Sequence, residues 1–440
     1  MSELLDLARF ALAEATKAGA DSADVSIAQG KSLEVELQES VVTSCDRHEG
    51  VSANVRCFVK GGCGVHMCHG LERGDLVHAA RAAVSSARAA GPDPDFRTLP
   101  APMPAGTVPD LYDERVAEMS VKSAAAVAQG VVDLALDVAR DVNVSGVLSA
   151  IASEGAFVNS LGVEAEEAAT SISNEVMCVV RRGGKTGSYS DFDAGRLWDD
   201  VDLEAVGRVT AEGSLRYLGP RKMQGGEMPC VFGPIAASAL LGSVAMAASA
   251  EPIQRGRSFL AERLGKRISP GILTIEDDGR YPAGLHSSSR DGEGTPRRPL
   301  VIVEKGVFAN ELHNSYTAGK GGTVSTGHGS QLGGIGPTNL RPHVGRLPAK
   351  SLISDVGDGL YVDSLLLSPN PVTGDISATV DWAMKIEHGE VAYPVTGIAI
   401  SGNVLNLLEC LEEISSDFRE EPGSIMPSLL FGKIQVSGAS

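Results

Sequence analysis

The chain has 440 residues, of which 56 are acidic and 38 are basic, so its formal net charge is −18. This length leaves room for two or three domains with substantial cores. The acidic balance argues against direct binding to DNA or to anionic membranes, because phosphate groups are bound by net basic surfaces.

Residues 1–91 predict an N-terminal α/β unit. Apolar side chains recur at helical spacing in the segment 2–19, and an alanine-rich helix is expected at 73–90. Between them the pattern predicts four strands, at 24–28, 32–42, 51–59 and 64–68. Residues 92–119 follow as a linker, because six prolines fall between positions 92 and 109.

Residues 120–222 predict a middle α+β unit. A long helix is expected at 120–140 and a second one at about 202–217. The strands expected between these helices are 144–154, 155–160, 163–182 and 188–192. Both units therefore combine helices with a meander of strands, and the fold class predicted for the whole chain is α+β.

Residues 223–440 predict a β-rich, largely antiparallel C-terminal domain. A strand at 227–232 leads to a helix of small residues at 235–250, and a further helix is expected at 255–264. The uncharged run at 235–250 has 16 residues, whereas a membrane span needs about 20 strongly apolar ones. We therefore interpret it as a buried helix.

The most informative stretch is 362–403. Apolar and polar residues alternate over 376–386, which predicts a half-buried strand, and a turn at 387–390 leads to a second alternating run that completes a hairpin. Asn403 then predicts the N-cap of a helix with one apolar face, formed by Val404, Leu407, Leu408, Leu411 and Ile414.

This stretch resembles the C-terminal signature of the PmbA/TldD family. The matching residues are Asn370, Thr373-Gly374-Asp375, Ser377, His388-Gly389-Glu390, Tyr393-Pro394-Val395 and Gly402-Asn403. Further segments resemble other family motifs, namely 157–162, 291–295, 325–328 and 337–340. The resemblance extends over effectively the whole chain.

The family has two arms that together form a heterodimeric peptidase. In the TldD arm, a helical HExxxH motif and a cysteine near the C-terminus hold zinc, with the glutamate as general base. Here the six motif positions fall on Gly242-Ser243-Val244-Ala245-Met246-Ala247, and the segment 421–426 has no cysteine. The chain therefore resembles the PmbA/TldE arm, which implies no catalytic residue and no cofactor in this chain. It leaves open whether the chain is an enzyme and implies that it is inactive alone.

The resemblance also implies what this chain contacts. A TldD-type partner would carry the zinc, the chain could form a homodimer when alone, and peptides or unfolded proteins would be the substrate. Neither nucleic acid nor membrane is expected to bind directly. The candidate residues of the substrate cleft are Asp291, Glu293, Thr326, His328, Asn370, Thr373 and Asp375. We also expect exposed hairpin edges such as 376–386 to pair with an extended peptide.

Two alternatives remain open at this point. The chain could be a self-sufficient homodimeric protein that binds peptides without cleaving them. It could also be a metalloenzyme that uses the cluster Cys63, His66, Cys68 and His69, although the spacing of these residues is not that of a zinc ribbon or finger. The seven cysteines are odd in number and spread over the chain, so we expect a reducing, cytoplasmic location rather than a disulfide framework.

The family has also been called a modulator of DNA gyrase. Because the chain is so acidic, we expect any such link to act through proteolysis of a partner protein rather than through DNA.

Overall fold

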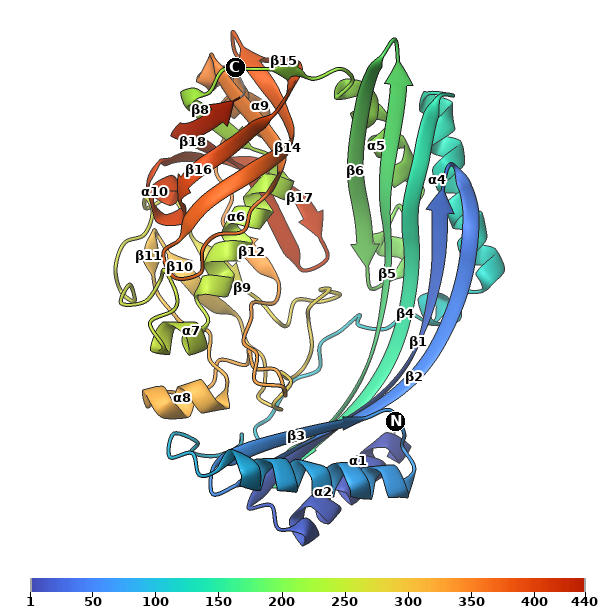
Figure 1. Ribbon diagram of the computed structural model, residues 1–440, viewed down its shortest axis with the longest axis vertical. Helices are drawn as coiled ribbons and strands as arrows, with labels where there is room; N and C mark the ends of the chain where they lie inside the picture. Colours follow the sequence, from blue (N-terminus) through green and yellow to red (C-terminus); the bar gives the residue numbers. More distant parts are fainter. Residues whose placement is uncertain (1, 439–440) are drawn as a thin grey trace.

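The structure is a computed structural model that describes residues 2–438. Its first part is one antiparallel sheet of six strands in the order β3-β2-β1-β4-β5-β6, which Figure 1 shows as a long, curved sheet. The strands are β1 (Ser22–Gln38), β2 (Val41–Val59), β3 (Gly62–Cys68), β4 (Val142–Asn159), β5 (Glu164–Arg182) and β6 (Lys185–Gly195). Because β1 pairs with β4, the strands on the two sides of the proline-rich linker belong to the same sheet.

Helices cover one face of this sheet at both ends. They are α1 (Ser2–Ala18), α2 (Arg73–Ala90), α3 (Glu114–Ala117), α4 (Val121–Val138) and α5 (Ala205–Arg216), with a short 3-10 helix at Trp198–Asp200. On β1, Val25 and Ile27 pack with α1 and α2, whereas Leu33 and Val35 pack with α4. All four positions are odd, so both groups of helices lie on the same face. The even positions therefore form the opposite face, and Asp24 contacts the C-terminal part of the chain from it.

The C-terminal part is built around a closed ring of strands. The ring runs β13-β8-β18-β16-β14 and returns to β13, because β14 pairs with both β16 and β13. Its strands are β8 (Gly226–Phe232), β13 (Gly359–Leu366), β14 (Asp375–Glu387), β16 (Ile398–Asn403) and β18 (Ser424–Gly438). The strands β7 (Arg221–Lys222), β15 (Glu390–Thr396) and β17 (Leu411–Glu421) extend it.

A smaller sheet and several helices complete this part. The sheet has the order β11-β10-β9-β12, with β9 (Ile275–Asp277), β10 (Leu300–Glu304), β11 (Val307–Phe308) and β12 (Leu340–Pro342). The helices are α6 (Pro234–Ala247), α7 (Ala250–Gln254), α8 (Ser315–Gly321), α9 (Ala349–Val356) and α10 (Val404–Glu409). The buried side of α6, which includes Leu240 and Leu241, packs in one hydrophobic core with the ring strands. No helix among residues 2–438 combines the length and apolarity needed to cross a membrane.

The predicted α+β class is confirmed, as are the helix at 235–250 and the hairpin that begins at 376. The helix predicted to continue to Ile414 is wrong beyond Glu409, because Leu411 and Ile414 lie on β17. A register shift between Leu411 and Glu413 keeps both side chains buried although they are three residues apart on a strand, and this spacing imitated a helix. The helix predicted at 255–264 is also absent, and the chain turns there through Gly256 and Glu262 with positive φ.

The peptide-binding edge predicted at 376–386 is wrong as well. β14 pairs with β16 over residues 375–379, with β13 over 379–386 and with β15 over 383–387, so this strand lies inside the sheet. Alternation along a strand reports which face is buried, but it carries no information about pairing along the strand's two sides.

Two glycines inside helices provide a test of the packing of α5. A Cβ atom on Gly207 would lie 2.0 Å from the carbonyl oxygen of Val131 on α4, whereas a Cβ on Gly242 of α6 would meet nothing within 4 Å. We expect Gly207→Ala to lower the free energy of unfolding by about 1–3 kcal/mol because the two helices must separate. The control, Gly242→Ala, should raise it by about 0.5–1 kcal/mol. Urea unfolding followed by circular dichroism measures both, and a Gly207→Ala variant as stable as the parent would contradict this packing.

Candidate functional site

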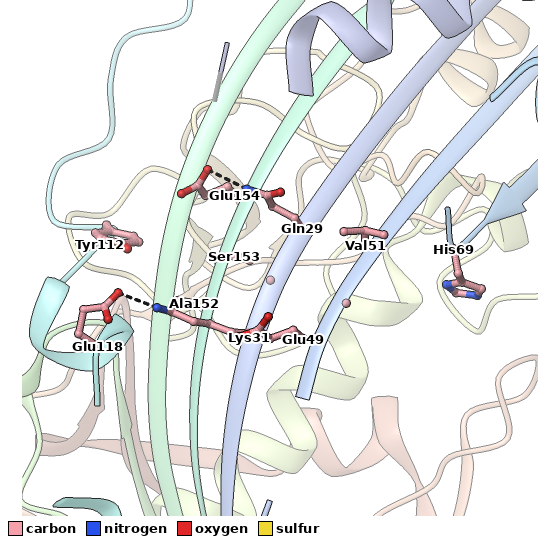
Figure 2. A pocket seen from close by; sticks show the side chains of 12 residues that line it. Gln29, Lys31, Glu49, Val51, His69, Tyr112, Glu118, Ala152, Ser153 and Glu154 are labelled. Carbon is pink, nitrogen blue, oxygen red and sulfur yellow. Dashed lines mark hydrogen bonds and ion pairs between the residues drawn. The ribbon is translucent and has the colours of Figure 1, made fainter. Parts of the chain in front are cut away.

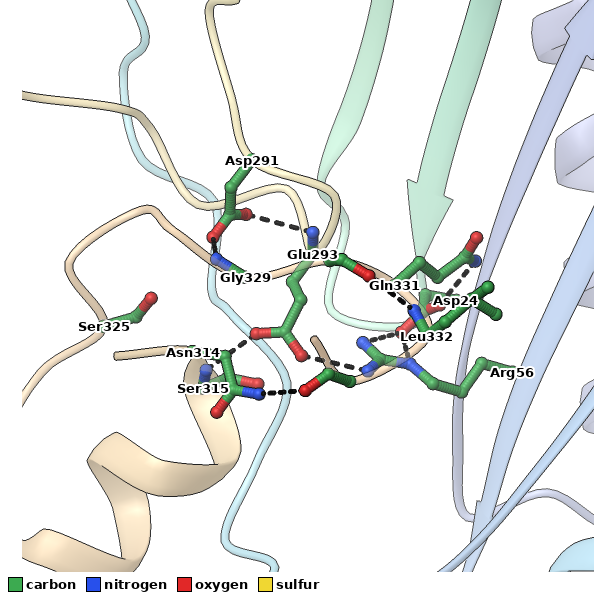
Figure 3. Close-up of polar contacts among 12 residues, drawn as sticks. Asp24, Arg56, Asp291, Glu293, Asn314, Ser315, Ser325, Gly329, Gln331 and Leu332 are labelled. Atoms are coloured by element: carbon green, nitrogen blue, oxygen red, sulfur yellow. Dashed lines mark hydrogen bonds and ion pairs between the residues drawn. The ribbon is translucent and has the colours of Figure 1, made fainter. Parts of the chain in front are cut away.

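A buried ionic network joins the long sheet to the C-terminal part (Figure 3). Asp24 on β1 and Arg56 on β2 lie directly opposite each other. The Arg56 guanidinium donates to Asp24 Oδ2 from Nε at 2.9 Å and from Nη2 at 2.7 Å. Its Nη1 donates to Glu293 Oε1, also at 2.9 Å. The side chain of Arg56 is 6% exposed, that of Asp24 0% and that of Glu293 1%. The chain therefore holds one cation between two carboxylates in its interior.

Hydrogen bonds from three further residues complete the network. Gln331 Nε2 donates to Asp24 Oδ1 at 2.8 Å, and the Ser26 hydroxyl donates to Gln331 Oε1. Glu293 Oε2 accepts the backbone N–H of Ser315 at 2.7 Å. Burial raises the pKa of Asp24, and the charge of Arg56 opposes this shift. Although burial lowers the pKa of Arg56, the two carboxylates raise it above its ordinary value, so the guanidinium stays charged.

Asp291 orients the loop that carries Glu293. Its Oδ1 accepts the backbone N–H groups of Glu293 at 3.0 Å and of Thr295 at 2.9 Å, and its Oδ2 accepts that of Gly329 at 2.9 Å. Burial, together with the nearby charge of Glu293, raises the pKa of Asp291 to about 6. Two candidate cleft residues, Asp291 and Glu293, are thus brought together, and their polar atoms bond to protein groups.

Thr326 and His328 belong to a neighbouring buried chain of hydrogen bonds. His328 Nε2 bonds Asp277 Oδ2 at 2.7 Å, and His328 Nδ1 bonds the Thr326 hydroxyl at 2.9 Å. The order Thr, His, Asp imitates an activated nucleophile. However, Thr326 Oγ1 also accepts the backbone N–H of His313 at 2.8 Å, and the residue is buried. What this geometry does is hold the loop around residues 326–329 in place.

The remaining three candidates lie elsewhere, at the entry to β14. Asn370 Oδ1 accepts the N–H groups of Val372 and Thr373, and the Thr373 hydroxyl donates to Asp375 Oδ2 at 2.7 Å. Asn403 Nδ2 donates to Asp375 Oδ1 at 3.0 Å, and these bonds lower the pKa of Asp375. Thr373, Asp375 and Asn403 border a surface cavity of about 830 Å³ that Asp291, Glu293, Thr326 and His328 do not line. Whether either group contacts a substrate stays a prediction.

Two cavities adjoin the long sheet. One, of about 340 Å³, lies on the face toward the C-terminal part and is lined by residues that include Ser26, Gly155, Arg290 and Gln331. The other, of about 710 Å³, is shown in Figure 2. It is lined by Gln29 and Lys31, whose odd positions place it on the helix-covered face. Lys31 Nζ is paired there with Glu118 at 2.6 Å.

Similarity to known proteins decides the family. Models of the PmbA/TldA metallopeptidase central domain and C-terminal domain match residues 108–218 and 225–438, respectively. The chain belongs to the PmbA/TldD family. It is 28% identical to metalloprotease PmbA of Escherichia coli O157:H7 over 435 residues, which cover 95% of each chain. It is also 28% identical to a metalloprotease PmbA homolog of Haemophilus influenzae over 99% of this chain and 96% of that protein.

Solved structures show the same fold. TldE from Thermococcus kodakarensis superposes with a TM-score of 0.90 at 24% identity, over 98% of this chain and 99% of that one. A putative modulator of DNA gyrase from Bacteroides thetaiotaomicron superposes with a TM-score of 0.91 at 24% identity over the whole of both chains. The curated relatives named above are PmbA proteins, so the chain stands with the PmbA/TldE arm of the PmbA/TldD family, as its sequence predicted.

The zinc site of the TldD arm does not fit the residues of this PmbA/TldE-type chain. Helix α6, which carries the segment 242–247, lies near the segment 421–426, because Ser238 on α6 and Glu421 line a common cavity of about 160 Å³ together with His286. In the segment 242–247 the only side-chain oxygen or nitrogen is that of the Ser243 hydroxyl, which donates to the Leu240 carbonyl oxygen at 2.7 Å. A zinc site needs at least three protein ligands. Within residues 2–438, no three His, Cys, Asp or Glu side chains are grouped to hold a metal ion.

The alternative metal cluster, formed by Cys63, His66 and Cys68 on β3 and by His69 directly after it, is also not supported, because these side chains are not grouped to hold a metal ion. His66 packs edge-on against His78, with ring centroids 5.6 Å apart, and the Cys68 thiol lies 3.4 Å from the Gly70 carbonyl oxygen. Burial raises the pKa of both Cys63 and Cys68, which disfavours the thiolate that a metal needs. His69 lines the 710 Å³ cavity on the helix-covered face.

Sequence reasoning missed Asp24, Arg56, Gln331 and Asp277. Asp24 and Arg56 occupy polar positions of alternating strand segments, as Ser26 and Asn54 do, so the alternation predicts an exposed face for them. Strand pairing places the two residues opposite each other, and the C-terminal part buries both. Local sequence therefore carried no signal for this pair.

Removing the buried cation should be far more damaging than removing an exposed one. Arg56→Met would leave Asp24 and Glu293 buried without a counter-charge, and we expect it to lower the free energy of unfolding by about 3–5 kcal/mol. Arg9 also makes two bonds to one carboxylate, that of Glu164, but lies at the surface. The control Arg9→Met should change stability little. Comparable losses from both substitutions in urea unfolding would show that the network is not buried in solution.

Asp291 should make stability depend on pH. Its pKa of about 6 in the folded chain lies above the value of about 3.9 in an unfolded chain. The folded state therefore keeps the extra proton between these values. The stability contributed by this group is complete below the window and is lost as the pH rises through about 6.

Replacing Asp291 by Asn removes this titration. The loss of unfolding free energy caused by Asp291→Asn should therefore be larger at pH 5 than at pH 7, by about 1 kcal/mol. Titrating groups that do not interact with Asp291 contribute equally to both proteins and cancel in the difference. Urea unfolding of parent and variant at both pH values gives the result, and a pH-independent difference would refute the raised pKa.

Proposed function

We propose that this chain is the zinc-less subunit of a heterodimeric metallopeptidase. In this proposal a TldD-type partner carries the zinc ion, and the present chain lines the substrate cleft through which small or unfolded peptides reach it. The observation that carries the proposal is the combination of a complete PmbA/TldE-type fold with metal positions at 242–247 that hold no ligand. A chain alone with these residues has nothing with which to activate water for attack on a peptide bond.

The architecture supports a passive but well-ordered role. The ionic network of Arg56 fixes the C-terminal part against one end of the long sheet. A second set of contacts joins the parts through β6: Arg419 pairs with Asp191 at 2.6 Å, and Trp382 Nε1 donates to the Ser188 carbonyl oxygen, also at 2.6 Å. A subunit that contributes only residues contacting the substrate must hold these residues rigidly, because catalysis depends on the position of the substrate relative to the metal.

Two further points belong to the proposal. All seven cysteines are free, which suits a reducing cytoplasm. Structural relatives are named modulators of DNA gyrase. For a chain with a net charge of −18, we propose that any such effect is exerted through proteolysis of a protein and not through contact with DNA.

Reconstitution tests the proposal. The chain purified alone should hold no stoichiometric zinc and should not cleave an unfolded protein such as reduced casein. Addition of a TldD-type subunit should give a complex with peptidase activity, and the same subunit with its motif glutamate replaced by glutamine should give a complex without it. Cleavage by the chain alone would refute the assignment, and so would a TldD-type subunit whose binding and activity are unaffected by this chain.

A further inference from the structure

The face of the long sheet that looks toward the C-terminal part has an uncovered apolar strip. Val147 and Ile151 on β4 and Met177 on β5 are 37%, 42% and 42% exposed, although they lie near the middle of a six-stranded sheet. Val147 and Ile151 share a face because they are four residues apart on one strand. Their neighbours across β1 are Glu36 and Ser32, at even positions, so the strip lies opposite the helix-covered face. We call these three residues the β4–β5 strip.

Carboxylates flank this strip on both sides. Val147 lies directly between Glu36 on β1 and Glu175 on β5. One residue pair further along the same face, Glu34 lies opposite Asp46 on β2. All four carboxylates are exposed, and none makes a salt bridge within residues 2–438. The surface therefore combines exposed apolar area with uncompensated negative charge.

The same face continues into the cavity beside the ionic network. Beyond Ile151 the outward positions of β4 are Ser153 and Gly155, and both line the 340 Å³ cavity together with Arg290 and Gln331. The side chains between the strip and the cavity are thus small. A polypeptide lying along β4 in an extended conformation would pass from the strip to the junction with the C-terminal part without meeting a bulky residue.

We infer that this face binds an extended polypeptide in which basic side chains, lysine or arginine, alternate with apolar ones at every second position, so that both kinds point toward the sheet. The inference rests on the proposed function and specifies its substrate class. In an extended chain, side chains on one face recur about every 7 Å and neighbouring strands lie about 4.8 Å apart. Glu36 and Glu175 lie one strand away from Val147 on either side. Basic side chains can therefore reach these carboxylates while an apolar side chain covers Val147.

Charge decides between this occupant and a second copy of the chain. The strip is bordered by unpaired carboxylates, and the chain as a whole carries a net charge of −18. Two such faces brought together would place like charges side by side, which opposes association. A basic, partly apolar peptide is complementary in both respects.

The experiment measures peptide binding by the chain alone. A fluorescein-labelled peptide of about 12 residues, in which lysine and valine alternate at every second position with serine between them, should show a raised anisotropy on binding. The same peptide with glutamate in place of lysine should not. The double variant Glu36→Gln/Glu175→Gln and the single variant Val147→Ser should each weaken binding about tenfold or more. Added salt should weaken binding of the parent chain.

The matched control is Glu72→Gln/Glu114→Gln, which removes the same charge from two exposed positions at the start of α2 and in α3. It should bind like the parent. Circular dichroism checks that every variant is folded. Equal binding of both peptides, or equal affinity of all variants, would overturn the inference. Sedimentation of the parent chain as a dimer that dissociates in the Val147→Ser variant would also overturn the inference, because a second copy of the chain would then occupy this face.

The two proposals can fail separately. If the reconstituted complex is active but the chain alone binds neither peptide, the zinc-less subunit stands and this surface is not its binding face. If the lysine–valine peptide binds through Glu36 and Glu175 but no partner confers activity, the binding face stands and the peptidase role falls.

Discussion

The structure depends on one buried cation. Arg56 projects from β2 into the junction between the long sheet and the C-terminal part, where Asp24 and Glu293 hold it. Removing a guanidinium from water is costly unless it is paired, so this contact is satisfied only when the two parts lie as they do. Glu293 is placed in turn by Asp291, whose carboxylate fixes the backbone of the loop 291–295. The exposed middle of the long sheet follows from this arrangement, because the C-terminal part is held at the sheet's ends.

Local pattern predicted much of this fold. Alternation located the hairpin at β14 and β15, and a run of small apolar residues located α6. Local pattern failed at Leu411 and Ile414. Their spacing of three residues is typical of a helix, but both lie on a strand in which a register shift produces the same spacing. It also could not show that β14 closes a ring, because strand pairing is a relation between distant segments.

The candidate site shows the same limit. Family motifs pointed to Asp291, Glu293 and His328, and these residues are close in space. Their partners Asp24, Arg56 and Asp277 were missed, since the pattern along a strand does not show that a distant part of the chain covers a polar position. Asn370, Thr373 and Asp375 were grouped with them by motif alone, but they stabilise a separate turn at the surface. A family motif identifies a set of residues, but it does not tell which of them bind substrate and which stabilise the fold.

The positions that match the HExxxH motif of the TldD arm lie where the fold does not depend on the side chains present. In α6 the core is formed by one side of the helix, where Leu240, Leu241, Val244 and Ala245 are buried. The positions that would hold the HExxxH side chains are Gly242, Ser243 and Ala247, and all three lie on the partly exposed side. A Cβ on Gly242 meets no neighbouring atom within 4 Å. Small side chains at these positions leave no core surface exposed, so the fold does not require ligands there. The core of α6 and the ionic network of Arg56 stabilise the C-terminal part without a metal ion at 242–247.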